Sequence, residues 1–273
     1  MENHSDRLVL VSERDGVATV VLNRPSARNA LNHALLTQLR DEFRRLASDE
    51  SVGAVVLTGT DPAFCAGLDL KELSSGVRLL DPSSGADEPP WLPWPAIEKP
   101  IIGAINGPAI TGGFELALNC DFLVASERAV FADTHARVGV LPAWGLSVLL
   151  PQRVGFAMAR RISFTGDFVD AEAALRCGLV TQIVEHDRLV PDAQAVAATI
   201  AANHRPAVLA LRRSYQQIES AVVGAGLEIE QATARLWREQ GGLSGLADRV
   251  PGVLSRGDQQ AGVAPGEVGD SSE

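Results

Sequence analysis

Short apolar runs rich in β-branched residues occupy the first part of the chain and predict strands. These runs span residues 8–11, 17–22, 54–58 and 101–105. Arg14-Asp-Gly16 separates the first two runs and has the composition of a tight hairpin turn. From residue 101 to about residue 184, short strands alternate with helical segments. This order predicts an α/β fold that contains repeated ββα units.

Apolar residues that recur every three or four positions predict helices. Asn32 can cap a helix that carries Leu35, Leu39, Phe43 and Leu46 on one face. A later helix is expected to run to about residue 202. Asp187 is expected to cap this later helix.

The last third of the chain is predicted to be helical. Pro206 suits the first turn of a helix because the first helical amide has no intrahelical acceptor. This helix would carry an apolar stripe made of Val208, Leu211, Tyr215, Ile218 and Val222, and a further helix would carry Ile229, Ala232 and Leu236. The pattern divides the chain into a core of residues 1–205, a helical region of residues 206–257 and a tail of residues 258–273. The tail is rich in Gly, Ser and acidic residues, which predicts disorder.

Two strand–turn–helix segments carry the candidate chemistry. Residues 106–121 place a glycine-rich turn before an apolar helix whose first turn contains Glu115. Residues 54–73 repeat this plan, with Ala66 and Gly67 in the turn and Asp69 where the helix begins. The first amides of a helix lack intrahelical acceptors, so two such turns could bind one oxygen that gains negative charge. Each segment alone is also consistent with a plain tight turn and a capping acid.

The paired motifs Phe64-Cys-Ala-Gly-Leu-Asp-Leu70 and Asn106-Gly-Pro-Ala-Ile-Thr-Gly-Gly-Phe-Glu-Leu116 resemble the signature of the crotonase superfamily, the enoyl-CoA hydratases and isomerases. Arg24-Pro-Ser-Ala-Arg-Asn-Ala-Leu31 resembles the first motif of that family. Similar stretches follow in order at 121–126, 139–142 and 166–180. The resemblance covers roughly residues 8–256. It implies a crotonase-type spiral of ββα units and a C-terminal helical region that assembles subunits into a homotrimer or a dimer of trimers.

The resemblance also implies roles for individual residues. It assigns the two oxyanion-hole amides to Ala66 and Gly112. Glu115 matches the first catalytic glutamate of the hydratases, and His135 stands where they carry the second. Histidine is a competent acid or base with an ordinary pKa of about 6.5, although it could also serve a different proton shuttle or only fill the pocket. If residues 133–135 are extended, Asp133 points the same way as His135 and could orient it. Replacing His135 by Glu restores the two-carboxylate arrangement and is therefore expected to retain or raise hydration.

The implied substrate is an acyl-CoA thioester. Coenzyme A is part of that substrate, and no separate cofactor is expected. The resemblance places the substrate against Ala27, Arg28, Ala66, Gly67, Leu68, Asp69, Leu70, Gly112 and Gly113. Lys71, Arg24 and Arg28 are candidates for phosphate contacts, although each is also a common kind of surface charge.

Three functions fit these residues. The leading hypothesis is an enoyl-CoA hydratase, which adds water across the 2,3 double bond. An enoyl-CoA isomerase would need a single base, either Glu115 or His135. A non-catalytic acyl-CoA-binding homologue is the third, and the retained Glu115 argues against it. Dienoyl isomerases carry an aspartate where this chain has Ala143, so they are disfavoured.

Composition narrows the possible partners. The net charge of −10 and the pI of about 5.0 argue against a broad nucleic-acid-binding face. The chain carries no apolar run of membrane-spanning length and opens without a signal-like segment. The five histidines show no metal-ligand spacing, so no metal site is expected. Cys65, Cys120 and Cys177 form no C-x-x-C pair, which predicts reduced thiols in a cytoplasmic protein, with Cys65 a packing residue.

The segment 74–94 is rich in Pro, Ser and Gly. It can be a plain surface loop. It can also be a flap whose Trp91, Leu92 and Trp94 close over an acyl tail. The residues alone leave both interpretations open.

Overall fold

A six-stranded sheet forms the centre of the protein. The computed structural model describes residues 7–74 and 92–260. The sheet has the order β1-β2-β3-β4-β6-β9, in which β1 and β2 pair antiparallel and all other pairs are parallel. Its strands are β1 (Val9–Arg14), β2 (Val17–Leu22), β3 (Ala54–Gly59), β4 (Ile101–Ile105), β6 (Phe122–Ser126) and β9 (Gln182–Val184). Asp15 and Gly16 both have positive φ, as the predicted hairpin requires.

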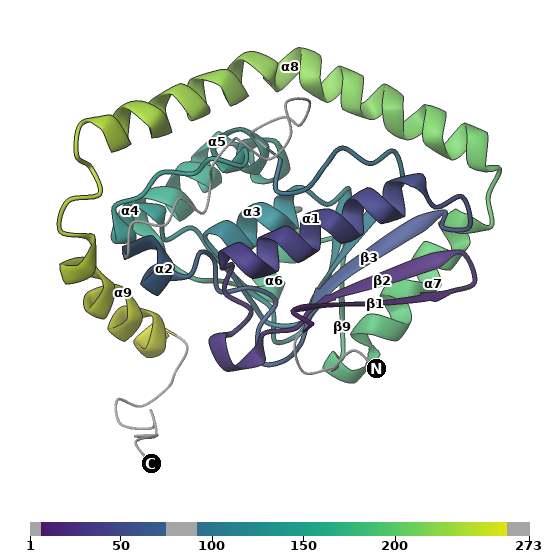
Figure 1. Cartoon of the computed structure of the whole chain (residues 1–273), viewed down its shortest axis with the longest axis horizontal. Helices are drawn as coiled ribbons and strands as arrows, with labels where there is room; N and C mark the ends of the chain where they lie inside the picture. The colour runs from purple at the N-terminus through teal and green to yellow at the C-terminus, as the bar shows by residue number, and fades with distance from the viewer. Residues whose placement is uncertain (1–6, 75–91, 261–273) are drawn as a thin grey trace.

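Helices cover both faces of this sheet. Along β3, Val55 and Leu57 belong to the core shared with α1 (His33–Ser48) and α3 (Gly112–Leu118). Ala54 and Val56 point to the opposite face, which packs against α7 (Leu189–Ala201). Alternate strand residues therefore face different helices, as the two-residue period of a strand requires. The mixed α/β class and the helical C-terminal region are as predicted (Figure 1).

A smaller sheet places α3 beside the short helix α4 (His135–Val138). Its strands have the order β5-β7-β8, with β5 and β7 parallel and β7 and β8 antiparallel. These strands are β5 (Pro108–Ile110), β7 (Val130–Ala132) and β8 (Val169–Asp170). Because β5 leads into α3 and β7 leads toward α4, the parallel pair brings the starts of both helices together.

The N-terminal half follows its predicted local chemistry. The Asn32 side chain accepts a hydrogen bond from the amide of Leu35 and caps α1. The predicted face of α1 is buried in the core. Lys99 is buried and donates to the carbonyl oxygens of Leu46 and Asp49, which satisfies the C-terminal end of this helix. The remaining short elements here are η2 (Pro25–Ala27) and α2 (Leu70–Ser74).

One long helix spans the top of the molecule in Figure 1. This helix, α8 (Arg205–Glu239), replaces the two helices predicted after Pro206. Gly224 and Gly226 lie inside it without breaking it, because an interior glycine costs only about 1 kcal/mol. Arg212 on α8 is buried against Asp121, with 2.9 Å between its Nε and both carboxylate oxygens. That ion pair connects α8 to the residue that precedes β6 of the central sheet.

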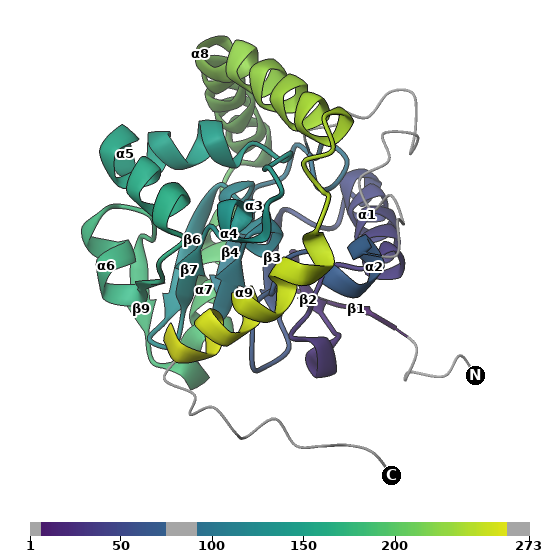
Figure 2. The ribbon, with the colours of Figure 1, turned by 90° about the vertical axis from the view of Figure 1, so that its left-hand side faces the viewer.

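Helix α9 (Leu246–Gln260) descends beside α4 and α2 (Figure 2). It continues past residue 257, where the sequence pattern predicted the tail to begin, and residues 261–273 lie outside the described part of the chain. The division into a core and an oligomerisation region stays a prediction. The predicted Asp187 cap is wrong, because Asp187 lies in η3 (His186–Arg188) and α7 begins after it without a side-chain cap. The other helices are α5 (Leu146–Thr165) and α6 (Ala171–Arg176).

The flap hypothesis receives no support from Trp94. Its ring is buried and stacks on Phe43, with 4.5 Å between the ring centroids. Trp94 therefore packs in the core beside α1, and the flap interpretation of the segment stays a prediction. Trp91 and residues 75–90 lie outside the described residues.

Candidate active site

Backbone hydrogen bonds bring the first motif against the first turn. Leu31 donates its amide to the carbonyl of Gly67 at 2.7 Å, and Asp69 donates to the carbonyl of Leu31 at 3.0 Å. Asn29 is fully buried, and its side-chain amide donates to the carbonyls of Thr60, Ala63 and Phe64. Cys65 also exchanges backbone hydrogen bonds with Pro108 and Ile110 of the motif at residues 106–116. The three sequence motifs therefore form one compact set of turns.

The structure corrects one oxyanion-hole assignment. The amide of Ala66 donates to the carbonyl oxygen of Arg28 at 3.0 Å, so it has no hydrogen for a substrate oxygen. Within the described residues, the amide of Leu68 has no hydrogen-bond acceptor. Gly112 is the first residue of α3, and its amide has no intrahelical acceptor either. A Cβ on Gly112 would lie 3.6 Å from the Leu68 nitrogen, which places these two donors side by side.

The turn at residues 66–69 and the turn before α3 approach each other closely, and two positions there require glycine. Gly67 has a φ of +93°, and a Cβ there would lie 2.8 Å from the carbonyl oxygen of Ile110. A Cβ on Gly113 would lie 2.1 Å from the carbonyl oxygen of Cys65. Both contacts are with backbone atoms, so larger residues would push the two turns apart.

We expect Gly113→Ala to lower the free energy of unfolding by about 1–3 kcal/mol, the usual effect of overpacking. Chemical denaturation measures this change. The matched control is Gly252→Ala on α9, because a Cβ there meets nothing within 4 Å. Equal stability of the Gly113→Ala variant and the native protein would contradict the close packing of the two turns.

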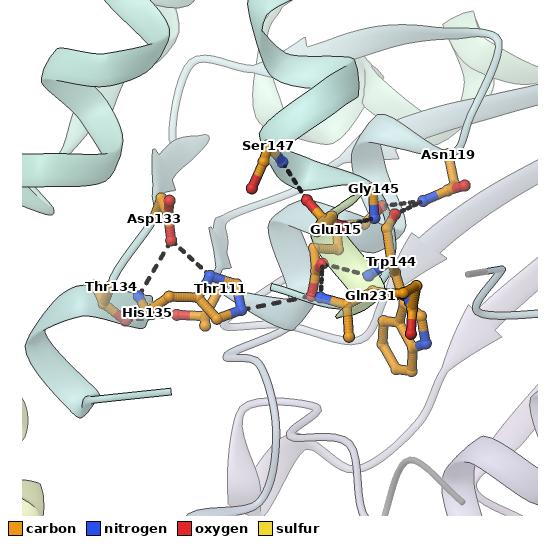
Figure 3. A network of polar contacts seen from close by, with 12 residues as sticks. Thr111, Glu115, Asn119, Asp133, Thr134, His135, Trp144, Gly145, Ser147 and Gln231 are labelled. Carbon is orange, nitrogen blue, oxygen red and sulfur yellow. Dashed lines mark hydrogen bonds and ion pairs between the residues drawn. The ribbon is translucent and has the colours of Figure 1, made fainter. Parts of the chain in front are cut away.

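Glu115 lies buried in the first turn of α3, as predicted. Its Oε1 accepts hydrogen bonds from the backbone amides of Ala143 at 3.0 Å and Trp144 at 2.7 Å (Figure 3). Two donors on one oxygen fix the orientation of the carboxylate. The second oxygen, Oε2, then faces His135.

His135 lies between two carboxylates. Its Nδ1 is 2.6 Å from Oδ1 of Asp133, and its Nε2 is 3.6 Å from Oε2 of Glu115. All three side chains are buried. The expected pairing of Asp133 with His135 is present, although the backbone here is the start of α4 rather than a strand. Asp133 also accepts the His135 amide at 3.1 Å.

This environment favours the charged imidazolium. Burial opposes the charge, but hydrogen bonds and attraction from Asp133 and Glu115 outweigh it and raise the pKa of His135 from 6.5 to about 10. Burial likewise opposes the ionisation of Asp133, yet its contacts with His135 lower the pKa of this carboxyl. His135 therefore carries a proton at neutral pH, which is different from an unperturbed histidine.

The raised pKa of His135 predicts how stability changes with pH. Its contribution to the free energy of unfolding is fully present below pH 6.5 and is lost as the pH rises toward about 10, because the folded state holds the proton longer. We expect His135→Gln to flatten the fall in stability across this window, measured by denaturation at several pH values. His204→Gln is the control because His204 is exposed. A native-like slope in His135→Gln would contradict the buried imidazolium.

Thr111 joins the starts of α3 and α4. Its hydroxyl is hydrogen-bonded to that of Thr134, directly before His135. Thr111 has a φ of +54°, which is unusual for a β-branched residue, and its amide donates to the carbonyl of Ala132 at 2.8 Å. Backbone strain of this kind clusters at functional sites. In this protein the strained residue, Thr111, lies where the starts of α3 and α4 bring Glu115 close to His135.

Several predicted contact residues have structural partners. Asp69 caps α2 through the amides of Lys71 and Glu72, and it pairs with Arg24 at 2.7 Å. The charge of Arg24 is therefore paired within the protein, and its guanidinium also donates to the carbonyl of Ala30. Among the other predicted contacts, Leu70 begins α2, and Ala27 and Arg28 lie beside the same turns.

Cys65 is a packing residue. It is completely buried, and burial raises the pKa of its thiol to about 12. A thiol with that pKa remains protonated at neutral pH and is a poor nucleophile. The three cysteines are free thiols.

Sequence reasoning missed Leu68 as a donor, the amides of Ala143 and Trp144, and the buried acid Glu230 on α8. Backbone amides leave no residue-type signal. Glu230 stands on an otherwise ordinary helix, and its partners are 85 and 83 residues earlier in the chain. The one sequence feature that points to these contacts is the turn Pro142–Gly145. Its glycine permits the positive φ that precedes α5.

In residues 7–74 and 92–260, no three His, Cys, Asp or Glu side chains are arranged to hold a metal ion. No helix in the described part of the chain has the length and hydropathy needed to cross a membrane.

Comparison with known proteins shows the family. The family model for enoyl-CoA hydratase/isomerase matches residues 12–239. A relative from Arabidopsis thaliana named probable enoyl-CoA hydratase 1, peroxisomal, is 38% identical, and the match covers 85% of this chain and 88% of the relative. The chain belongs to the enoyl-CoA hydratase/isomerase family of the crotonase superfamily.

Solved structures agree with this assignment. A crystal structure of an enoyl-CoA hydratase from Mycobacterium avium is 51% identical, with a TM-score of 0.79 and coverage of 86% of this chain and 99% of that one. A monofunctional enoyl-CoA isomerase from M. smegmatis is 32% identical, with a TM-score of 0.65 and coverage of 78% and 94%. The predicted family and fold class are confirmed.

Proposed function

We propose that the protein is an enoyl-CoA hydratase. The observation that carries this proposal is the buried pair Glu115–His135, separated by 3.6 Å, beside the two amide donors of Leu68 and Gly112. Hydration needs a group that takes a proton from water and a group that gives one to carbon. An isomerase needs only one base, so a second positioned proton carrier favours hydration.

The reaction follows from these positions. Water adds to C3 of the enoyl thioester as Glu115 takes its proton, and electrons move onto the thioester oxygen. The amides of Leu68 and Gly112 stabilise that oxygen, and one such donor typically lowers the barrier by about 3–4 kcal/mol. The enolate collapses as C2 takes the Nε2 proton of His135. Proton transfer from Glu115 to His135 then restores both groups.

The assignment of coenzyme A rests on the same turns. The thioester oxygen would lie between residues 67–68 and 112–113, with Ala27, Arg28, Asp69 and Leu70 lining the approach. Arg28 and Lys71 remain the proposed phosphate contacts, whereas Arg24 is held by Asp69. Coenzyme A is part of the substrate in this proposal, and no nucleic acid or membrane takes part. The free thiols support a cytoplasmic location.

The proposal is tested by adding a short 2-enoyl-CoA to the purified protein. Hydration removes the conjugated double bond, so the near-ultraviolet absorbance of the thioester should fall. The same protein is assayed with a 3-enoyl-CoA, which has no conjugated bond to lose. Appearance of conjugation from the 3-enoyl-CoA without loss from the 2-enoyl-CoA would identify an isomerase. Binding of both thioesters without either change would identify a non-catalytic acyl-CoA-binding protein.

We also propose that copies of the chain assemble through α8 into a trimer or a dimer of trimers. The predicted apolar stripe is on the surface: Leu211 is 61% exposed, Tyr215 73% and Val222 75%. These residues border a cavity of about 820 Å³ between α8 and the core. Several large apolar side chains exposed together on one helix are typical of a subunit interface.

Light scattering at micromolar concentration is expected to give three or six times the subunit mass. Tyr215→Glu should shift the protein toward smaller species, because the exposed ring would be replaced by a charge inside the interface. Glu228→Gln on the same helix is the control, since Glu228 is already polar and exposed. A native protein that remains monomeric would refute this assembly.

A further inference from the structure

A buried carboxylate on α8 holds the turn that precedes α5. Glu230 is 6% exposed. Its Oε1 accepts the amide of Gly145 and its Oε2 accepts the amide of Ser147, both at 2.6 Å. These amides belong to the start of α5, where the first donors have no intrahelical acceptors. One side chain from a distant helix therefore satisfies two of them.

The same turn holds Glu115. Ala143 and Trp144, which donate both amides to Oε1 of Glu115, come immediately before Gly145. The next residue of α8, Gln231, donates its side-chain amide to the carbonyl of Ala143. Turn 143–147 is thus fixed on one side by α8 and presents its amides to Glu115 on the other.

We propose that Glu230 is a positioning residue, which acts through turn 143–147 to orient Glu115 toward His135. The inference rests on the proposed role of Glu115 as the base that accepts a proton from water. It makes α8, the helix with the exposed apolar stripe, part of the active-site support. Assembly through α8 and catalysis would then depend on the same helix.

A carboxylate suits this position better than other side chains. It offers one oxygen to each of the two amides, whereas a glutamine offers one acceptor and places an NH₂ group against the second donor. An alanine leaves both buried donors without a partner, which is unfavourable. Burial and the nearby charge of Glu115 raise the pKa of Glu230, consistent with its closeness to the catalytic carboxylate.

The kinetic test compares Glu230→Ala, Glu230→Gln and the control Glu228→Ala, whose side chain is exposed on the same helix. We expect Glu230→Ala to lower kcat for hydration about tenfold to a hundredfold, the scale of a small misplacement of a catalytic group. KM should change less than threefold, because Glu230 does not border the thioester turns. Glu230→Gln should fall between Glu230→Ala and the native protein. Unchanged kcat in folded Glu230→Gln and Glu230→Ala would overturn the proposal.

A second readout does not depend on activity. Among the described residues, the charged groups that act on His135 are Asp133 and Glu115. If turn 143–147 loosens, Glu115 withdraws and the pKa of His135 falls, which NMR of labelled histidine can follow. Gln231→Ala removes a contact of the turn without removing a charge, so it should lower this pKa in the same direction. Retention of the native His135 titration in both Gln231→Ala and Glu230→Gln would overturn the proposal.

The two readouts separate this inference from the proposed function. A native protein that hydrates no enoyl-CoA would refute the hydratase assignment, while the His135 titration would still decide whether Glu230 orients Glu115. Full hydration in the native protein together with unchanged variants would refute the inference alone. Thermal unfolding of each variant shows whether it is folded at the assay temperature, and kcat is calculated for folded protein.

Discussion

Glu115→Gln is expected to lower kcat for hydration at least about a hundredfold, the usual contribution of a general acid or base. The substitution keeps the size of the side chain. Its carbonyl oxygen can still accept the amides of Ala143 and Trp144, so the fold around α3 should persist. The amide cannot take a proton from water, and its NH₂ group would face the His135 imidazolium. KM should change little because the amides of Leu68 and Gly112 remain.

Steady-state kinetics with a 2-enoyl-CoA gives both constants, and calorimetry gives the affinity for a saturated acyl-CoA. Glu228→Gln serves as the control, since it makes the same chemical change on the exposed surface of α8. Native turnover in Glu115→Gln would remove Glu115 from the mechanism. Loss of acyl-CoA affinity together with turnover would instead assign it to binding.

His135→Ala is expected to reduce hydration by a similar factor, because it removes the proton donor to C2. It also leaves Asp133 and Glu115 in one buried site without the cation between them. The structure changes the expectation for His135→Glu. Three carboxylates would then share a buried site, and like charges at such distances disfavour ionisation of all of them. This single variant should be inactive.

The combined variant Asp133→Asn, His135→Glu is the matched comparison. It removes one carboxylate and restores the two-glutamate arrangement that the hydratase resemblance implies, so it should recover activity relative to His135→Glu alone. Asp133→Asn by itself tests the orientation of the imidazole. If His135→Ala hydrates at the native rate, His135 only fills the pocket and a single-base mechanism is favoured.

Much of the fold could be predicted from local patterns. Asn32 caps α1, Asp15-Gly16 closes the hairpin, and β3 is a buried apolar run, because each depends on neighbours a few residues away. The resemblance to the hydratases predicted the roles of Glu115 and His135. Their contact, at 3.6 Å, depends on the pairing of β5 with β7 and required the structure.

The remaining features depend on contacts between distant segments. The family resemblance assigned Ala66 as a donor, and nothing in the sequence shows that its amide pairs with the carbonyl of Arg28. Trp94 sits in a Pro-rich segment typical of a loop, yet its ring stacks on Phe43 of α1. Glu230 resembles any helical acid until its two amide partners are seen. The pKa of His135 likewise depends on burial and two carboxylates from different elements.

The most direct test of the central claim is to follow the oxygen of water into the product. The native protein and the Glu115→Gln and His135→Ala variants are incubated with a 2-enoyl-CoA in water enriched in heavy oxygen, and the thioesters are analysed by mass spectrometry. We predict that the native protein forms a 3-hydroxyacyl-CoA that carries one heavy oxygen atom, and that both variants form far less of it. A native protein that forms no labelled hydroxyacyl-CoA, or that only moves the double bond of a 3-enoyl-CoA, would contradict the account.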